Sequence, residues 1–132
     1  MPAPGESSAL TPVPFEVINE ELDGGILAIR IRGELDLNTA PELEKSLQKG
    51  LGRDGAPIVI DLSECEFIDS TGIALIVRAW QHCDRNGEGS GKGRLVICCG
   101  NEQVQRLLEL TGVEASIPMF ADRDEAIVAL RD

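Results

Sequence analysis

Hydrophobic residues follow two different periods along the chain, and the change of period predicts its secondary structure. Segments 15–22 (FEVINEEL) and 26–33 (ILAIRIRG) alternate apolar and polar residues as strands do, and Asp23-Gly24-Gly25 between them is a tight-turn signal. Three later segments are short and mostly apolar, which is typical of central strands: 56–62 (APIVIDL), 94–99 (RLVICC) and 115–120 (ASIPMF). The pattern therefore predicts a hairpin followed by three further strands.

Segments with helical spacing alternate with these strands. In 37–51 (LNTAPELEKSLQKGL), Thr39 is a candidate cap, Glu42 its reciprocal partner, and Pro41 falls in the first turn, where proline is tolerated. Apolar residues at helical spacing predict three more helices, at 70–86, at 101–112 with Gly112 as its stop, and at 121–132. The element order is β-β-α-β-α-β-α-β-α, which predicts an α/β domain. We expect a mixed, mostly parallel sheet with an N-terminal hairpin and about four helices.

Length and composition favour one folded domain. A chain of 132 residues, 42% of them hydrophobic, can bury one core but is short for two domains. Residues 1–13 contain three prolines among small and polar residues, so we interpret them as a flexible tail preceding a domain at 14–132. The N-terminus lacks the basic and apolar regions of a secretion signal, and no apolar run approaches the ~20 residues that span a bilayer. We expect a cytoplasmic protein without a membrane segment.

Charge and cysteine usage narrow the possible partners. The formal net charge is −11, which disfavours direct binding to nucleic acid and favours a protein partner with a basic patch. The four cysteines, which lack metal-ligand spacing, are expected to be free and buried rather than disulfide-bonded or bound to zinc: Cys65, Cys83, Cys98 and Cys99. Cys98 and Cys99 are adjacent in a predicted strand and should face opposite sides of the sheet.

Several catalytic interpretations fail on spacing. The glycine-rich segment 86–93 (NGEGSGKG) lacks the residue order of a phosphate-binding loop and precedes a strand instead of a helix. Ser70 and the single histidine, His82, are twelve residues apart on one predicted helix, about 18 Å, too far for a nucleophile–base pair. Three aspartates remain as a possible acid–base or cation-binding cluster, because each follows or ends a strand: Asp36, Asp61 and Asp69.

The stretch FIDSTGIALIV, residues 67–77, interrupts an apolar run with small and polar residues. Phe67 and Ile68 are expected to end a buried segment, and Ile73 begins the apolar face of a helix. Serine, threonine and aspartate are all good helix caps, so one interpretation of Asp69-Ser70-Thr71 is capping alone. A cap at an exposed helix start also presents an accessible hydroxyl, which leaves room for a functional role.

Two segments carry a specific resemblance. GELDLNTAPEL (33–43), followed by VIDLSECEFIDSTGIALIV (59–77), resembles the STAS domain of bacterial anti-sigma factor antagonists. This resemblance implies a non-enzymatic protein without a cofactor or metal. Its unphosphorylated form would bind an anti-sigma factor that is also a serine kinase, and so release a sigma factor. The kinase would phosphorylate Ser70, and a separate phosphoserine phosphatase would reverse this.

The same resemblance implies the partner surface. It maps onto the Ser70 segment and the loop before the first helix: Asp36, Asn38, Thr39, Asp69, Thr71 and Gly72. Ala74 stands where family members often have a second glycine. Two other classes stay open, which are a STAS scaffold or transporter-associated module without phosphorylation, and an enzyme. We expect a phosphate at Ser70 to block partner contact rather than unfold the domain, and the sequence leaves the oligomeric state open.

Overall fold

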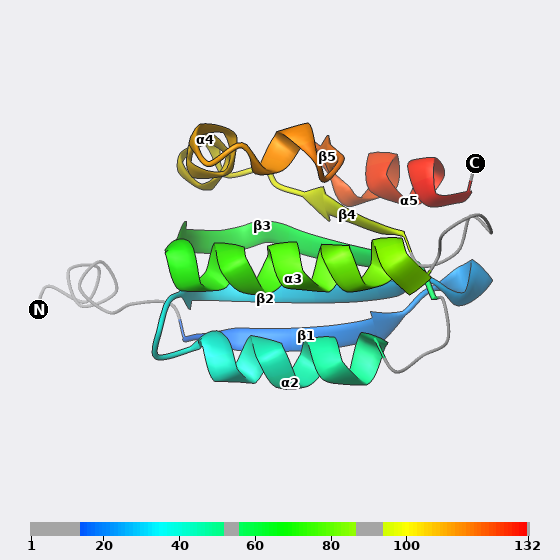
Figure 1. Ribbon diagram of the computed structural model, residues 1–132, viewed down its shortest axis with the longest axis horizontal. Coiled ribbons are helices and arrows are strands. Elements are labelled where there is room, and N and C mark those ends of the chain that lie inside the picture. The colour runs from blue at the N-terminus through cyan, green and yellow to red at the C-terminus, as the bar shows by residue number, and fades with distance from the viewer. Residues whose placement is uncertain (1–13, 52–55, 87–93, 132) are drawn as a thin grey trace, which may run out of the picture.

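The computed structural model describes residues 14–51, 56–86 and 94–131. The predicted tail at 1–13 lies outside the described residues, as does the glycine-rich segment apart from Asn86. One five-stranded sheet forms the centre, with strands in the spatial order β1-β2-β3-β4-β5 (Figure 1). Its strands are β1 (Glu16–Glu21), β2 (Leu27–Leu35), β3 (Ile58–Ile68), β4 (Leu95–Cys98) and β5 (Met119–Phe120). Only the β1–β2 pair is antiparallel, so the predicted mixed, mostly parallel sheet with an N-terminal hairpin is confirmed.

Within the described ranges, four α-helices pack on the sheet, as the pattern predicts. They are α2 (Ala40–Leu51), α3 (Ser70–Asn86), α4 (Glu102–Leu110) and α5 (Arg123–Arg131), and two short 3-10 helices accompany them, η1 (Asp23–Gly25) and η2 (Val113–Ala115). In Figure 1, α2 and α3 run side by side in front of the sheet. Apolar residues of α2, α3 and α4 share one buried cluster with the sheet, whereas those of α5 belong to a second cluster. Helix α5 therefore packs on the opposite face of the sheet.

The N-terminal hairpin depends on two glycines. Gly24 and Gly25 have φ angles of 83° and 77°, a left-handed region that residues with a Cβ rarely adopt. The Leu22 amide donates to the Ile26 carbonyl at 2.8 Å and closes the connection. The turn signal in the sequence therefore marks a real conformational requirement.

The alternation of the strands assigns their side chains to the two faces. Leu27, Ile29 and Ile31 of β2 enter the cluster beneath α2 and α3, whereas Ala28 enters the cluster beneath α5. Cys98 and Cys99 face opposite sides, as expected.

All four cysteines are free and buried, which confirms their prediction as structural thiols. Burial raises the pKa of the Cys65 and Cys83 thiols to about 11, so both stay protonated and unreactive near neutral pH.

Two strands differ in length from the pattern. Strand β3 continues beyond the predicted end at residue 62 as far as Ile68, because its second half keeps pairing with β2. Two register shifts in β2, between Arg30 and Arg32 and between Gly33 and Glu34, accompany this pairing. The last strand keeps only two of the six predicted residues, since η2 occupies part of that segment. No helix within the described ranges is long and apolar enough to cross a membrane.

Candidate interaction site around Ser70

Parallel pairing of β2 and β3 brings the two segments of the sequence motif to one edge of the sheet. The strands end together at the pair Leu35 and Ile68, and the Asp69 amide donates to the Leu35 carbonyl at 3.1 Å. Because parallel strands point the same way, the segments after both strands leave the sheet side by side. We call the group Asp36, Leu37, Asn38, Thr39, Phe67, Asp69, Ser70 and Thr71 the Ser70 site.

A compact turn forms the first half of the Ser70 site. One carboxylate oxygen of Asp36, Oδ1, accepts hydrogen bonds from the amides of Asn38 at 2.9 Å and Thr39 at 3.1 Å. The Thr39 hydroxyl accepts from the Asp36 amide and donates to the Glu34 carbonyl, each at 2.8 Å. These bonds hold residues 34–39 as one unit.

The structure differs here from the capping box expected for α2. The Glu42 amide donates to the Thr39 carbonyl at 3.0 Å and not to the Thr39 hydroxyl. The hydroxyl instead bonds back toward Glu34 and Asp36. The Thr39 side chain therefore connects the start of α2 to the preceding loop. The Asp36 carboxylate accepts hydrogen bonds from the free amides of Asn38 and Thr39.

Asp69 connects the two halves of the site. Its Oδ1 atom accepts hydrogen bonds from the amides of Thr71 at 2.9 Å and Gly72 at 3.1 Å, so Asp69 is the N-cap of α3. Its Oδ2 atom accepts from the amide of Leu37 at 3.2 Å, thirty-two positions away in sequence. One carboxylate thus fixes the start of α3 against the loop that precedes α2.

Ser70 is exposed at the first position of α3. Within the described residues its hydroxyl makes no hydrogen bond, because the capping function belongs to Asp69. The capping expected of Asp69-Ser70-Thr71 is therefore confirmed for Asp69, whereas Ser70 is not the cap. The expectation of an outward-facing hydroxyl on an apolar frame agrees with the structure, since Ile68 and Ile73 beside it are buried.

Gly72 holds the start of α3 close to the sheet. A Cβ atom at Gly72 would lie 2.7 Å from Cγ of Leu35 and 3.1 Å from Cγ1 of Ile68. Both neighbours are buried and have little room to move. Gly72 is itself buried, so the structure shows a packing role for it; its expected contact with a partner stays a prediction.

Two apolar side chains of the Ser70 site are exposed, and the sequence analysis missed both. Leu37 is 70% exposed and Phe67 is 44% exposed. The expectation that Phe67 ends a buried segment is wrong, although Ile68 beside it is buried. The signal for Leu37 was present in the sequence, because an apolar residue between Asp36 and Asn38 has no obvious place in a polar loop. Phe67 points to the side of β3 opposite to the buried Ile68, and it belongs to neither buried cluster.

Asp61 does not join the other two aspartates. It lies on the α5 face of the sheet, 4% exposed, and accepts from the Ser63 hydroxyl at 2.6 Å and from Nε of Arg123 at 3.1 Å. Arg123 also pairs with Glu20 at 3.0 Å. We call Glu20, Asp61, Ser63 and Arg123 the Asp61 cluster. The suggested grouping of Asp36, Asp61 and Asp69 is therefore not formed, and the described residues hold no group of three or more ligands suited to a metal.

Comparison with known proteins agrees with this geometry. A curated relative, the anti-sigma F factor antagonist of Paenibacillus polymyxa, is 27% identical over 114 residues, which cover 86% of this chain and 93% of the relative. A crystal structure of an anti-sigma factor antagonist from Mycobacterium paratuberculosis superposes with a TM-score of 0.79 and 25% identity, and the match covers 90% of this chain and 96% of that one. The anti-sigma factor antagonist SpoIIAA in its unphosphorylated form has the same fold, with a TM-score of 0.67 and 17% identity over 88% of this chain and 98% of that one. The sequence model of the STAS domain matches residues 18–126. The chain belongs to the STAS domain family.

Proposed function

We propose that this protein is an anti-sigma factor antagonist. Its unphosphorylated form binds an anti-sigma factor that is also a serine kinase, releases a sigma factor, and is switched off by phosphorylation of Ser70. The observation that carries the proposal is the exposed Ser70 hydroxyl at the first position of α3, which has no hydrogen bond to any described residue. Relatives named as anti-sigma factor antagonists support the general role.

The shape of the Ser70 site suits modification by a kinase. The hydroxyl stands on the first turn of a helix whose free amides at Thr71 and Gly72 are already satisfied by Asp69. The transfer of a phosphoryl group to Ser70 therefore breaks no hydrogen bond within the described chain. A separate phosphoserine phosphatase would restore the hydroxyl.

The surface around Ser70 suits protein contact. Protein interfaces place exposed apolar side chains at their centre and polar groups at their rim. Leu37 and Phe67 supply apolar anchors, while Asp36 and Asn38 supply the polar surroundings. The acidic net charge of −11 favours a partner with a basic surface.

A phosphate at Ser70 acts on binding more strongly than on folding. It adds about −1.5 to −2 charges. The N-terminus of α3 attracts these charges by about 0.3–1 kcal/mol, whereas the carboxylate of Asp69 repels them, so the free energy of unfolding changes little. Burial of the same dianion against a partner without a matching cation costs several kcal/mol. Since each ~1.4 kcal/mol is tenfold in affinity, we expect a loss of at least about a hundredfold.

Titration calorimetry with the cognate anti-sigma factor tests the proposal. Ser70→Ala should bind like the parent and accept no phosphoryl group, whereas Ser70→Asp should bind at least about a hundredfold more weakly with a near-parental melting temperature. Ala115→Asp, which adds the same charge at an exposed position of η2, should leave the affinity unchanged. If Ser70→Asp binds as tightly as the parent, exclusion by charge is wrong.

The phosphorylation step has its own readout. Incubation with the kinase partner and ATP should add one phosphoryl group to the parent, visible by intact mass, and none to Ser70→Ala. Absence of transfer to the parent, together with intact binding, would favour a STAS interaction module without phosphorylation.

The apolar anchors can be tested with a matched pair of leucines. Leu37→Ala should weaken partner binding about tenfold, because it truncates a central contact. Leu110, 76% exposed at the end of α4, provides the control, and Leu110→Ala should leave the affinity unchanged. Equal effects of the two changes would place the partner surface elsewhere.

A further inference from the structure

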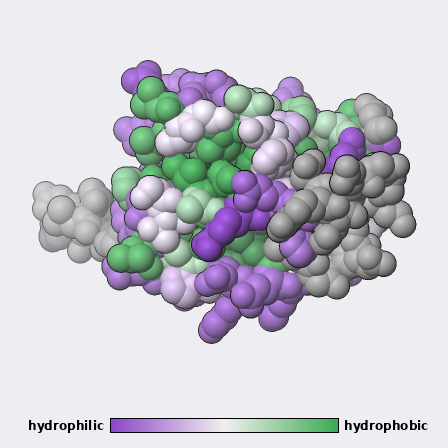
Figure 2. Space-filling view, in the orientation of Figure 1, coloured by the Kyte–Doolittle hydropathy of each residue, from purple (hydrophilic) through white to green (hydrophobic). Residues whose placement is uncertain are grey.

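A separate hollow lies between α3 and the segment that joins α4 to β5. Its volume is about 220 Å³, and residues of α3 face residues of η2 across it. Figure 2 shows apolar atoms gathered in this hollow on the face of the molecule that carries α3. Trp80 lies ten residues after Ser70 on the same helix, which corresponds to about 15 Å along its axis. The hollow is therefore distinct from the Ser70 site.

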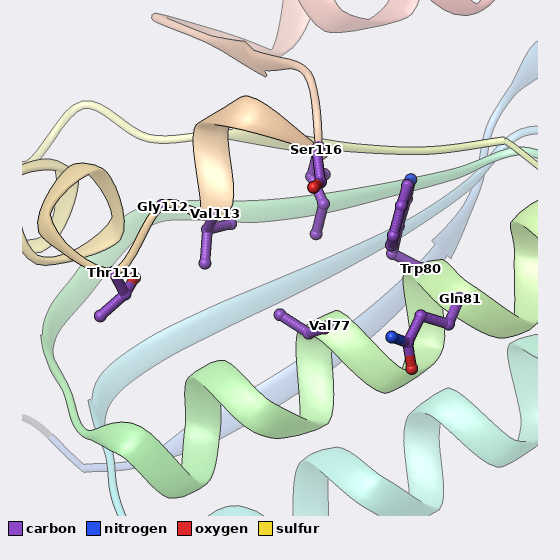
Figure 3. A pocket seen from close by; sticks show the side chains of 8 residues that line it. Val77, Trp80, Gln81, Thr111, Gly112, Val113 and Ser116 are labelled. Atoms are coloured by element: carbon purple, nitrogen blue, oxygen red, sulfur yellow. The ribbon is translucent and has the colours of Figure 1, made fainter.

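Four of the eight residues that line the hollow supply apolar side chains. Val113 and Ile117 are buried and form one side. Val77 and Trp80 are half-buried and form the other. In Figure 3, Val77 and Trp80 reach up from α3 toward Val113 and Ser116. An indole ring of this kind offers a flat apolar surface for stacking against a second ring.

Polar groups also line the hollow, among them the side-chain amide of Gln81. Within the described residues, neither the indole N–H of Trp80 nor the hydroxyl of Ser116 makes a hydrogen bond. The Thr111 hydroxyl, also at the hollow, differs because it already donates to backbone carbonyls of α4 at 3.0 Å. Binding pockets typically combine apolar walls with a few placed polar groups that orient the ligand. The hollow has this composition.

Volume and charge limit what fits. An apolar cavity of about 150 Å³ holds benzene, whereas sites for drug-sized ligands start at about 300 Å³. A volume of about 220 Å³ therefore suits one ring or two fused rings. The net charge of −11 disfavours an anion. We infer that the hollow binds a small neutral aromatic molecule whose hydrogen-bond acceptor meets the Trp80 indole N–H.

The single tryptophan of the chain makes this inference directly testable. In a ¹⁵N-labelled sample, the one indole N–H signal in the NMR correlation spectrum belongs to Trp80. Coumarin, a neutral two-ring lactone, is the probe, and cyclohexanone is the non-aromatic comparison with a similar carbonyl. We expect coumarin to shift the indole signal saturably with a Kd of about 1 mM or below, and cyclohexanone to bind at least about tenfold more weakly.

Matched variants locate the binding. Ser116→Leu removes the hydroxyl and fills the mouth, so the Kd for coumarin should rise at least about tenfold. Ala115→Leu adds a leucine at the exposed neighbouring position, outside the hollow, and should leave the Kd unchanged. Melting temperatures check that both variants fold. If Ser116→Leu does not fold, Ser116→Ala replaces it. This variant keeps the space but loses the hydroxyl, and it should still weaken the binding of coumarin.

Three results would overturn the inference. One is the lack of a saturable shift of the indole signal with coumarin. Another is an equal Kd for the parent and Ser116→Leu, which would place the probe elsewhere. The third is a shift of the same signal with protein concentration alone, which would assign the hollow to a second copy of the chain. The experiment uses no anti-sigma factor, so its outcome is independent of the proposed function.

Discussion

Asp61 and Asp69, eight residues apart, have different structural roles. Asp61 lies within β3 on the α5 face, is almost fully buried, and pairs with the guanidinium of Arg123. Asp69 directly follows the end of β3, and its partners are three backbone amides. The Asp61 carboxylate joins a distant helix to the sheet, whereas the Asp69 carboxylate arranges two chain segments around an exposed hydroxyl. The same residue type thus stabilises the fold in one place and presents a site in the other.

The neighbouring serines show the same contrast. Ser63 and Ser70 are both exposed, but the Ser63 hydroxyl is committed to Asp61 at 2.6 Å. Within the described chain the Ser70 hydroxyl is unbonded because Asp69 bonds to amides instead. Two exposed serines can therefore differ in whether the hydroxyl is hydrogen-bonded. The partners of the nearby carboxylate decide which case applies.

The largest effect should come from Asp61→Asn. The change removes the charge that faces Arg123 and turns an amide donor toward it, so the free energy of unfolding at pH 7 should fall by about 3 kcal/mol. Urea denaturation measures this loss. A loss below about 0.5 kcal/mol, the level of an ordinary surface change, would show that the Asp61 cluster is not a structural anchor.

The pH dependence of the same variant sharpens the test. Burial tends to raise the pKa of Asp61, but hydrogen bonds from Ser63, Cys98 and Arg123 outweigh burial, and the pKa lies below its ordinary value. A lowered pKa contributes stability that is complete above the unfolded value of about 3.9 and is lost as the pH falls through the folded value. The difference in the free energy of unfolding between the parent and Asp61→Asn should therefore become smaller below about pH 4. A difference that stays constant from pH 7 to pH 3 would contradict the role of the charge.

Gly72→Ala should have the next largest effect. The new methyl group would meet Leu35 at 2.7 Å, and overpacking of a buried position costs about 1–3 kcal/mol. Gly100→Ala is the control, because its Cβ would meet only the Ala121 carbonyl, at 3.8 Å. Thermal unfolding should separate the two variants. Equal melting temperatures would mean that the start of α3 can shift away from the sheet.

The sequence predicts the frame of the molecule better than the Ser70 site itself. Hydrophobic periods identify the strands and helices because burial of one face imposes those periods. The resemblance to STAS domains places Asp36 and Asp69 in one region, and parallel pairing of β2 and β3 brings them there. The exposure of Phe67 depends on which part of the sheet the packed helices leave uncovered, and the bond from Leu37 to Asp69 depends on a contact across thirty-two positions. Neither leaves a periodic signal.

Asp69→Asn provides the counterpart of Asp61→Asn at the Ser70 site. An amide can keep one acceptor for the cap or for the Leu37 amide, but not both in the present geometry, so the expected loss of stability is about 1 kcal/mol. The loop 36–39 should then lose its bond to α3, and partner affinity should fall more than stability. Chemical denaturation and calorimetry with the anti-sigma factor measure the two quantities. A loss of stability as large as that of Asp61→Asn would erase the contrast between the two carboxylates.

The smallest effects should distinguish the two serines. Ser63→Ala removes a hydrogen bond to a buried carboxylate, so the free energy of unfolding should fall by about 1 kcal/mol, with unchanged partner binding. Ser70→Ala removes a hydroxyl that bonds to nothing in the described chain, so its effect on stability should stay within about 0.5 kcal/mol. Both variants lose the same atom from an exposed serine, which makes the difference a measure of bonding alone. If Ser70→Ala were the more destabilising of the two, the Ser70 hydroxyl would have a structural partner, and a kinase would have to break that bond before it could transfer phosphate.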